Sequence, residues 1–181
     1  MLKWLGLLLV LISWTAGFYL TKAWPGTKAM SISRHAASAK SATRLFAVTL
    51  LVGGTVSYFW LVAWFVPHIN LQSQFIALLT VTFVAQIIVG LIPDSNRGKS
   101  KLHRIAAYSM TMLYVPLGLL VVSSHNIGKS AKIIGVTCLA YMVATALVFL
   151  AIKRARTHHL IVQALYIVAF QVLILSAAYL K

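Results

Sequence analysis

The sequence predicts an all-α integral membrane protein, a polytopic bundle of six transmembrane helices. Of the 181 residues, 61% are hydrophobic and only 9% are charged, whereas a soluble domain is about 45–50% apolar and about 25% charged. A water-soluble fold cannot hide that much apolar surface, so the surrounding solvent must be lipid. In lipid every backbone amide needs an internal partner, and long apolar runs therefore form helices.

Six apolar runs of this kind follow one another along the chain. Each supplies about 20 residues, which is enough to cross the ~30 Å hydrocarbon core at 1.5 Å per residue. We expect helices at residues 2–20, 44–66, 72–92, 103–123, 131–152 and 159–180. Pro67 and Pro93 follow the second and third runs, and Lys153 and Arg154 follow the fifth. No linker is long enough to separate a second domain, so residues 1–181 are expected to form a single transmembrane domain.

The first run begins like a signal peptide, with Lys3 ahead of an apolar core. The apolar run continues to Leu20, which favours a membrane-spanning helix over a cleaved leader. Residues 21–43 then form the longest polar stretch, in which Pro25 and Gly26 mark a turn. After this turn we expect a short helix at the headgroup level, an N-terminal extension of the second span, or a flexible loop.

The charge pattern is one-sided. Sixteen Lys and Arg face a single acidic residue, Asp94, and the formal net charge is +15. The loops after the first, third and fifth spans carry twelve of these cations, and the rest of the chain carries four. The positive-inside rule therefore predicts that these three loops are cytoplasmic and both termini outside. Anionic membrane lipids are the expected partners of this basic face. A protein with an acidic surface is an alternative partner, and nucleic acid is not expected because the charges lie in short loops between spans.

The interior of the spans holds no Asp, Glu, Lys or Arg away from the helix ends. Ion-coupled pumps use such residues as relays and a retinal Schiff base needs a mid-span Lys, so both classes are disfavoured. Milder polar residues remain, among them Gln86, Tyr114 and Gln171. Buried amides cross-link helices more often than they line a substrate path. Gly53 and Ser57 form a small-xxx-small pair, which predicts close helix packing.

The polar residues of the basic face form the candidate site. The stretch between the third and fourth spans carries the only acid and four cations, with His103 where the next apolar run begins. On the sixth span, His159, Gln163 and Tyr166 follow one helix face at i, i+4 and i+7. The predicted ligand-binding residues are Asp94, Arg97, His103, Arg104, His159, Gln163 and Tyr166.

Two cofactor alternatives stay open, although no cofactor is the expectation. Imidazoles with a carboxylate can ligate Zn²⁺. The metal-ligand candidates are Asp94, His103, His158 and His159. Twelve cations on the same face oppose a bound dication. Helix capping by these residues, or pairing of Asp94 with Arg97 or Arg104, is the simpler interpretation. His68 and His125 share the opposite side and are haem-ligand candidates.

The chain carries no nucleophile motif, no zinc-protease motif and no phosphate-binding glycine loop. With one carboxylate in the chain, two-carboxylate chemistry is excluded. These observations favour a protein that is not an enzyme.

The turn between the third and fourth spans carries a family resemblance. Gly90, Pro93, His103 and Ala107 match a Gly-x-x-Pro turn, a short loop and a His-x-x-x-Ala helix start. With its six spans and longer first loop, the chain resembles the DUF998 family of small prokaryotic membrane proteins, which is similar to the Frag1/DRAM/Sfk1 group. The resemblance implies a prokaryotic plasma membrane and a loose connection to lipid organisation. It also implies termini inside, the reverse of the charge count, and we follow the charge count because it uses this chain's own residues.

The sequence therefore predicts a membrane protein that binds or moves a lipid or small amphiphile at a basic membrane face. One alternative is a metal- or haem-dependent membrane enzyme or redox protein that uses Asp94 and the neighbouring histidines. A second alternative is an accessory subunit of a larger membrane complex, whose acidic partner supplies the missing negative charge.

Overall fold

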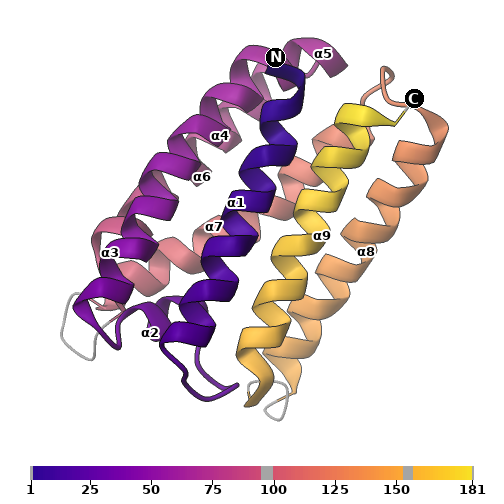
Figure 1. The fold of residues 1–181 in the computed structure, drawn as a ribbon. Coiled ribbons are helices and arrows are strands. Elements are labelled where there is room, and N and C mark those ends of the chain that lie inside the picture. Colours follow the sequence, from indigo (N-terminus) through magenta and orange to yellow (C-terminus); the bar gives the residue numbers. More distant parts are fainter. Residues whose placement is uncertain (1, 95–99, 153–156, 181) are drawn as a thin grey trace.

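Six helices that are long and apolar enough to cross a membrane run side by side in the structure (Figure 1). The computed structural model describes residues 2–94, 100–152 and 157–180. The spans are α1 (Leu2–Ala23), a continuous helical segment over Lys40–Ile69, α6 (Ser73–Leu91), α7 (Ser100–Val122), α8 (Lys129–Ala151) and α9 (His159–Tyr179). The described residues contain no strand, and the predicted all-α six-helix bundle is confirmed.

Helices that follow one another in the chain are neighbours in the bundle, from the second span through α9. α1 closes the arrangement, because it packs against the second span on one side and approaches α9 on the other. At the end where both termini lie (Figure 1), Trp4 of α1 stacks on Tyr179 of α9 at 5.8 Å, and the Tyr179 hydroxyl donates to the Lys3 carbonyl. We call this end the terminal end and the opposite end the basic end.

The second span is one helix with two wider turns. It consists of α3 (Lys40–Val48), the π-helical turn η1 (Thr49–Gly53), α4 (Gly54–Trp60), the π-helical turn η2 (Leu61–Phe65) and α5 (Val66–Ile69). η2 ends two residues before Pro67, which lacks the N–H that a regular turn needs. η1 lies against α6, where the Gln86 amide donates to the Leu50 carbonyl at 2.9 Å. Asn70 ends the span in the left-handed conformation, with φ of 53°, a common C-terminal cap.

The polar stretch after α1 forms two of the three expected structures. A short helix, α2 (Ile32–Ala36), lies at the basic end of the bundle (Figure 1), and α3 extends the second span to Lys40. The Ser31 side chain caps α2 by accepting from the Arg34 N–H at 3.3 Å. The main core gathers large apolar side chains from several spans, including Leu9, Phe65, Phe75, Leu117 and Leu173.

Two adjacent glycines in the second span provide a test of how closely the helices pack. A methyl group on Gly54 would lie 1.8 Å from the Gln86 Nε2 atom, whereas one on Gly53 meets nothing within 4 Å. We expect Gly54→Ala to lower the free energy of unfolding by about 1–3 kcal/mol, because the Gln86–Leu50 hydrogen bond is displaced. Gly53→Ala should be neutral or stabilising by up to about 1 kcal/mol. Unfolding in mixed micelles, followed by circular dichroism, measures both, and equal stability of the two variants would contradict the packing described here.

Candidate ligand-binding crevice

A cavity of about 300 Å³ lies inside the bundle, between α1, the η1–α4 part of the second span, α6, α7 and α9. α1 lines it from Gly6 to Leu20, a length of roughly 21 Å at 1.5 Å per residue. This cavity, which we call the crevice, is therefore elongated along the helix axes.

The wall of the crevice is uncharged. Among the described residues that line it there is no Asp, Glu, Lys or Arg. Gly17 and Gly53 widen it, because a methyl group on either would meet nothing within 4 Å. Gly53 and Ser57 both line the crevice. The expectation that this pair marks close helix packing is therefore wrong at Gly53, which faces open space.

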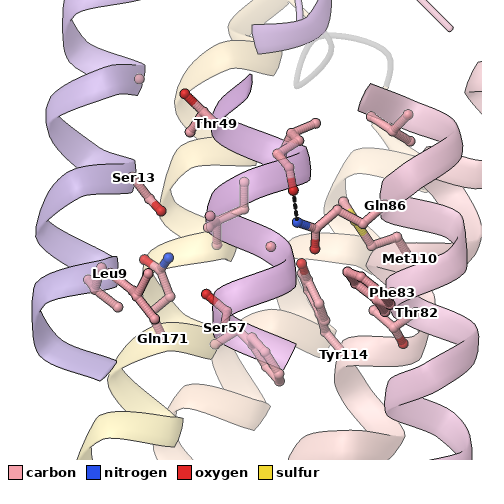
Figure 2. A pocket seen from close by; sticks show the side chains of 18 of the residues that line it. Leu9, Ser13, Thr49, Ser57, Thr82, Phe83, Gln86, Met110, Tyr114 and Gln171 are labelled. Carbon is pink, nitrogen blue, oxygen red and sulfur yellow. Dashed lines mark hydrogen bonds between the residues drawn. The ribbon is translucent and has the colours of Figure 1, made fainter. Parts of the chain in front are cut away.

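Five uncharged polar side chains, one from each wall helix, line the middle of the crevice (Figure 2). We call them the polar belt: Ser13 (α1), Ser57 (α4), Gln86 (α6), Tyr114 (α7) and Gln171 (α9). They lie at least five residues inside their helical spans, where the bilayer has no water with which to satisfy them. The belt is thus a set of hydrogen-bonding groups near the centre of the membrane.

Contacts between neighbouring helices place the belt members at similar heights. Gly6 of α1 lies against the Trp60 indole. Because the two helices run in opposite directions, Ser13 lies at about the height of Gly53, seven residues along each helix. Gln86 bonds to the carbonyl of Leu50, three residues before Gly53.

The other two belt members are tied to this height by direct contacts. The Trp14 indole N–H donates to Gln171 Oε1 at 2.6 Å, which joins α1 to α9. Tyr114 of α7 stacks on Phe170, the residue before Gln171, with ring centroids 4.1 Å apart. Ser13, Gln86, Tyr114 and Gln171 therefore lie at similar heights in the bundle, and Ser57 lies about one helical turn closer to the terminal end.

The chemistry of the partners fixes which way each amide points. An indole N–H can only donate, so Gln171 must turn its oxygen to Trp14 and keep its Nε2 donors for the crevice. A carbonyl can only accept, so Gln86 turns its nitrogen to Leu50 and keeps its Oε1 acceptor. Within the described part of the chain, these two remaining groups make no hydrogen bond. The belt thus offers one amide donor and one amide acceptor.

Two tyrosines in the crevice wall differ in the state of their hydroxyl groups. Tyr58 stacks on Phe83 at 4.6 Å, and its hydroxyl pairs with Thr80 Oγ1 at 2.9 Å. Tyr114 has a similar stacked geometry on Phe170, but its hydroxyl has no hydrogen-bond partner among the described residues. Figure 2 shows the Tyr114 side chain pointing into the crevice, as Gln86 does. The Tyr114 hydroxyl is therefore a further free group of the belt, as are the Ser13 and Ser57 hydroxyls, which also make no hydrogen bond among the described residues.

Two further polar groups line the crevice between the belt and the basic end. Gln163 of α9 accepts the Ile32 N–H at 3.0 Å, which again leaves its Nε2 donors. His103 is 1% exposed, and its Nδ1 contacts the Ile92 carbonyl. Because a carbonyl only accepts, Nδ1 carries the proton, and Nε2 is a buried acceptor without a partner. The basic half of the crevice thus adds two free polar groups to a lining that also contains apolar side chains such as Leu20, Phe46 and Val89.

The terminal half of the crevice is apolar in chemistry. Its wall side chains include Leu9, Leu61, Leu79, Ile174 and Leu175. Most of its polar side chains are already hydrogen-bonded: the Thr82 hydroxyl donates to the carbonyl of Leu78 at 2.8 Å, and Tyr58 and Trp60 also have partners. Among the described residues, the Ser57 hydroxyl is the one polar lining group of this half that makes no hydrogen bond.

The structure separates the predicted site residues. His103 and Gln163 line the crevice. Asp94 instead forms an ion pair with Arg34 of α2, with Nε and Oδ2 3.4 Å apart. Arg104 is exposed, and Arg97 lies outside the described residues.

The predicted stripe on α9 points at three different elements. His159 lies 4.8 Å from the Phe149 ring of α8, and Gln163 bonds to α2. Tyr166 is buried and donates its hydroxyl to the Thr111 carbonyl of α7 at 2.8 Å. Residues spaced at i, i+4 and i+7 lie on one side of a helix, but that side can contact more than one neighbouring element. A stripe in the sequence therefore need not form one site.

The metal-ligand candidates do not converge. His158 is exposed and bonds to its neighbour Thr157, and Asp94 is occupied by Arg34. In the described ranges, no group of three His, Cys, Asp or Glu is placed to hold a metal ion. The haem candidates His68 and His125 are both exposed, and His68 stacks on Trp64 at 4.7 Å.

Sequence reasoning missed the two serines of the belt and the role of Arg34. Gly53 and Ser57 did carry a signal, since small residues at i and i+4 line a crevice as readily as they permit packing. The sequence around Arg34 carried no such signal, because its partner, Asp94, lies 60 positions away in the chain.

These features define the class of protein: a six-helix membrane bundle with an uncharged crevice that reaches from the basic end past the bilayer centre. No protein-family model matches the chain, and neither does any curated protein or solved structure.

The Arg34–Asp94 ion pair should contribute little to stability. Arg34 is 48% exposed, so water screens the pair, and exposed pairs contribute about 0.2–1 kcal/mol. A double-mutant cycle with Arg34→Met and Asp94→Asn should give a coupling free energy below about 1 kcal/mol that shrinks further in high salt. A salt-independent coupling well above this range would show that the pair is desolvated.

Proposed function

We propose that this protein binds a small, uncharged amphiphile in the crevice. The observation that carries the proposal is the chemistry of the wall: free amide and hydroxyl groups at the belt, apolar surface around them and no charge. Buried polar groups without partners cost about 1–3 kcal/mol each. A ligand that supplies partners at the belt and apolar contact elsewhere removes this cost.

The shape of the crevice supports a single-chain ligand. Its elongated form and small volume favour one alkyl chain over the two chains of a diacyl phospholipid. At about 300 Å³, it lies at the lower end of the range of small-molecule sites. A preference for single-chain molecules would let the protein select a minor component of the bilayer.

The basic end supports a second, separate role for anionic lipids. The described cations there, including Lys22, Lys28, Lys40, Arg44 and Lys101, are exposed. A surface of this kind attracts anionic headgroups and, by the positive-inside rule, would face the cytoplasm. This orientation, like the resemblance to the DUF998 family, is part of the proposal.

Filling the crevice should abolish amphiphile binding. In phosphatidylcholine nanodiscs, we expect octan-1-ol to raise the unfolding temperature of the wild-type protein saturably, by roughly 5 °C at about 100 times Kd. Gly53→Leu places a side chain in the open space next to Gly53 and should remove this effect.

The control is Val52→Leu, which enlarges the adjacent residue on the lipid side, where Val52 is 59% exposed. It should respond to octan-1-ol as the wild type does. Equal responses from Gly53→Leu and the wild type, or no saturable response in either, would reject the crevice as a binding site.

Removing the basic-end cations should release anionic lipid. We expect the variant Lys22→Gln, Lys28→Gln, Lys40→Gln to retain less phosphatidylglycerol after detergent purification, as measured by lipid mass spectrometry. The matched control neutralises Lys3, Lys129 and Lys132 at the terminal end and should retain wild-type amounts. Equal retention by both variants would contradict the role proposed for the basic end.

A further inference from the structure

We infer that the ligand carries a hydroxyl headgroup, which binds at the polar belt while its single chain extends toward the terminal end. This inference rests on the proposed binding function and goes beyond it by naming the headgroup, its position and the direction of the chain. It follows from three observations: the free groups at the belt, the absence of charge in the wall, and the difference between the two halves of the crevice.

The free groups at the belt match a hydroxyl. Gln171 offers Nε2 donors, Gln86 offers an Oε1 acceptor, and the Tyr114 hydroxyl can donate or accept. A hydroxyl is one of the few uncharged groups that donates and accepts through a single atom. A pure hydrocarbon would leave these belt groups without partners in a medium of low dielectric constant, which is costly.

Charged headgroups are disfavoured by the same wall. A carboxylate or phosphate would need Lys or Arg, and an amine would need a carboxylate, because an unpaired charge near the bilayer centre is expensive. The described lining residues provide neither. The only acid in the chain, Asp94, is paired with Arg34 and is not part of the crevice wall.

The two halves of the crevice set the direction of the ligand. Between the belt and the basic end, Gln163 Nε2 and His103 Nε2 add a free donor and a buried acceptor without a partner. Between the belt and the terminal end, the lining side chains are mainly apolar, and the Trp60 indole packs on Gly6. The polar groups on the basic side of the belt therefore favour the hydroxyl there, and the chain fits the apolar half.

Two tyrosine variants separate a specific headgroup contact from a general loss of packing. Tyr114→Phe removes a hydroxyl that has no protein partner among the described residues, and its ring can still stack on Phe170. Tyr58→Phe is the matched control, because its hydroxyl is already paired with Thr80. Both residues line the crevice and both stack on a phenylalanine.

The experiment compares octan-1-ol with nonane, which has the same number of heavy atoms, at equal bilayer concentration in phosphatidylcholine nanodiscs. Saturable thermal stabilisation gives an apparent affinity for each ligand. We expect the wild type and Tyr58→Phe to prefer octan-1-ol by at least tenfold. We expect Tyr114→Phe to lose most of this preference while its affinity for nonane is unchanged.

Each result bears on a different claim. If octan-1-ol and nonane bind the wild-type protein equally, the crevice binds chains but the hydroxyl assignment is overturned, and the proposed function survives. If neither octan-1-ol nor nonane binds, both the hydroxyl assignment and the proposed function are overturned. Tighter binding of octanoate or octylamine than of octan-1-ol would also overturn the assignment, as would an equal loss in Tyr58→Phe and Tyr114→Phe.

Chain length tests the direction of binding. The distance from Ser13 to Gly6 on α1 is roughly 10 Å, which corresponds to about eight extended carbon–carbon bonds. We expect affinity in an alcohol series from hexan-1-ol to hexadecan-1-ol, after correction for bilayer partitioning, to peak near octan-1-ol. A steady rise to hexadecan-1-ol would show that the chain leaves the crevice and would overturn the assigned direction.

Discussion

A buried polar group in a bilayer must find its hydrogen-bond partner within the protein or its ligand. Most of this bundle satisfies that constraint with short contacts between helices, such as Tyr166 with the Thr111 carbonyl. At the belt the constraint is only half met. Gln86 and Gln171 each use one end of the amide to join two helices and leave the other end unpaired. The same residues therefore hold the bundle together and, in the proposed function, would select what binds inside it.

Small residues serve two opposite purposes in the wall of the crevice. Gly6 and Gly54 allow a large side chain to approach the backbone, the Trp60 indole in one case and the Gln86 amide in the other. Gly17 and Gly53 instead leave space that nothing fills. The first pair brings helices together, and the second keeps an open channel between them. An alanine at any of these four positions would look conservative in sequence but would act differently in each pair.

The basic end shows how charge is kept out of the interior. α2 and the turn before it are fastened to α9 by the Ile32 N–H to Gln163 and by the Leu160 N–H to the Lys28 carbonyl. The only acid, Asp94, is paired with Arg34 beside this segment. The exposed cations thus surround the end of the crevice without lining it. A basic surface and an uncharged interior can then coexist a few residues apart along the same helices.

The sequence by itself determined the class of fold. Apolar runs of about 20 residues can only be helices in lipid, so six spans and a strongly basic set of loops follow from composition and length. It also identified His103 and Gln163, because polar residues inside apolar runs are conspicuous. It could not decide which neighbour each one meets. His159, Gln163 and Tyr166 share a sequence stripe but contact three different elements.

Only the tertiary structure decided where the site lies and what chemistry it has. The belt combines residues from five spans, whose heights depend on how antiparallel helices are aligned, and no local pattern encodes that alignment. The orientation of each amide depends on its partner, Trp14 for Gln171 and Leu50 for Gln86, which lie 157 and 36 positions away. Composition specified a bundle in lipid, and long-range packing placed its few polar groups around a crevice.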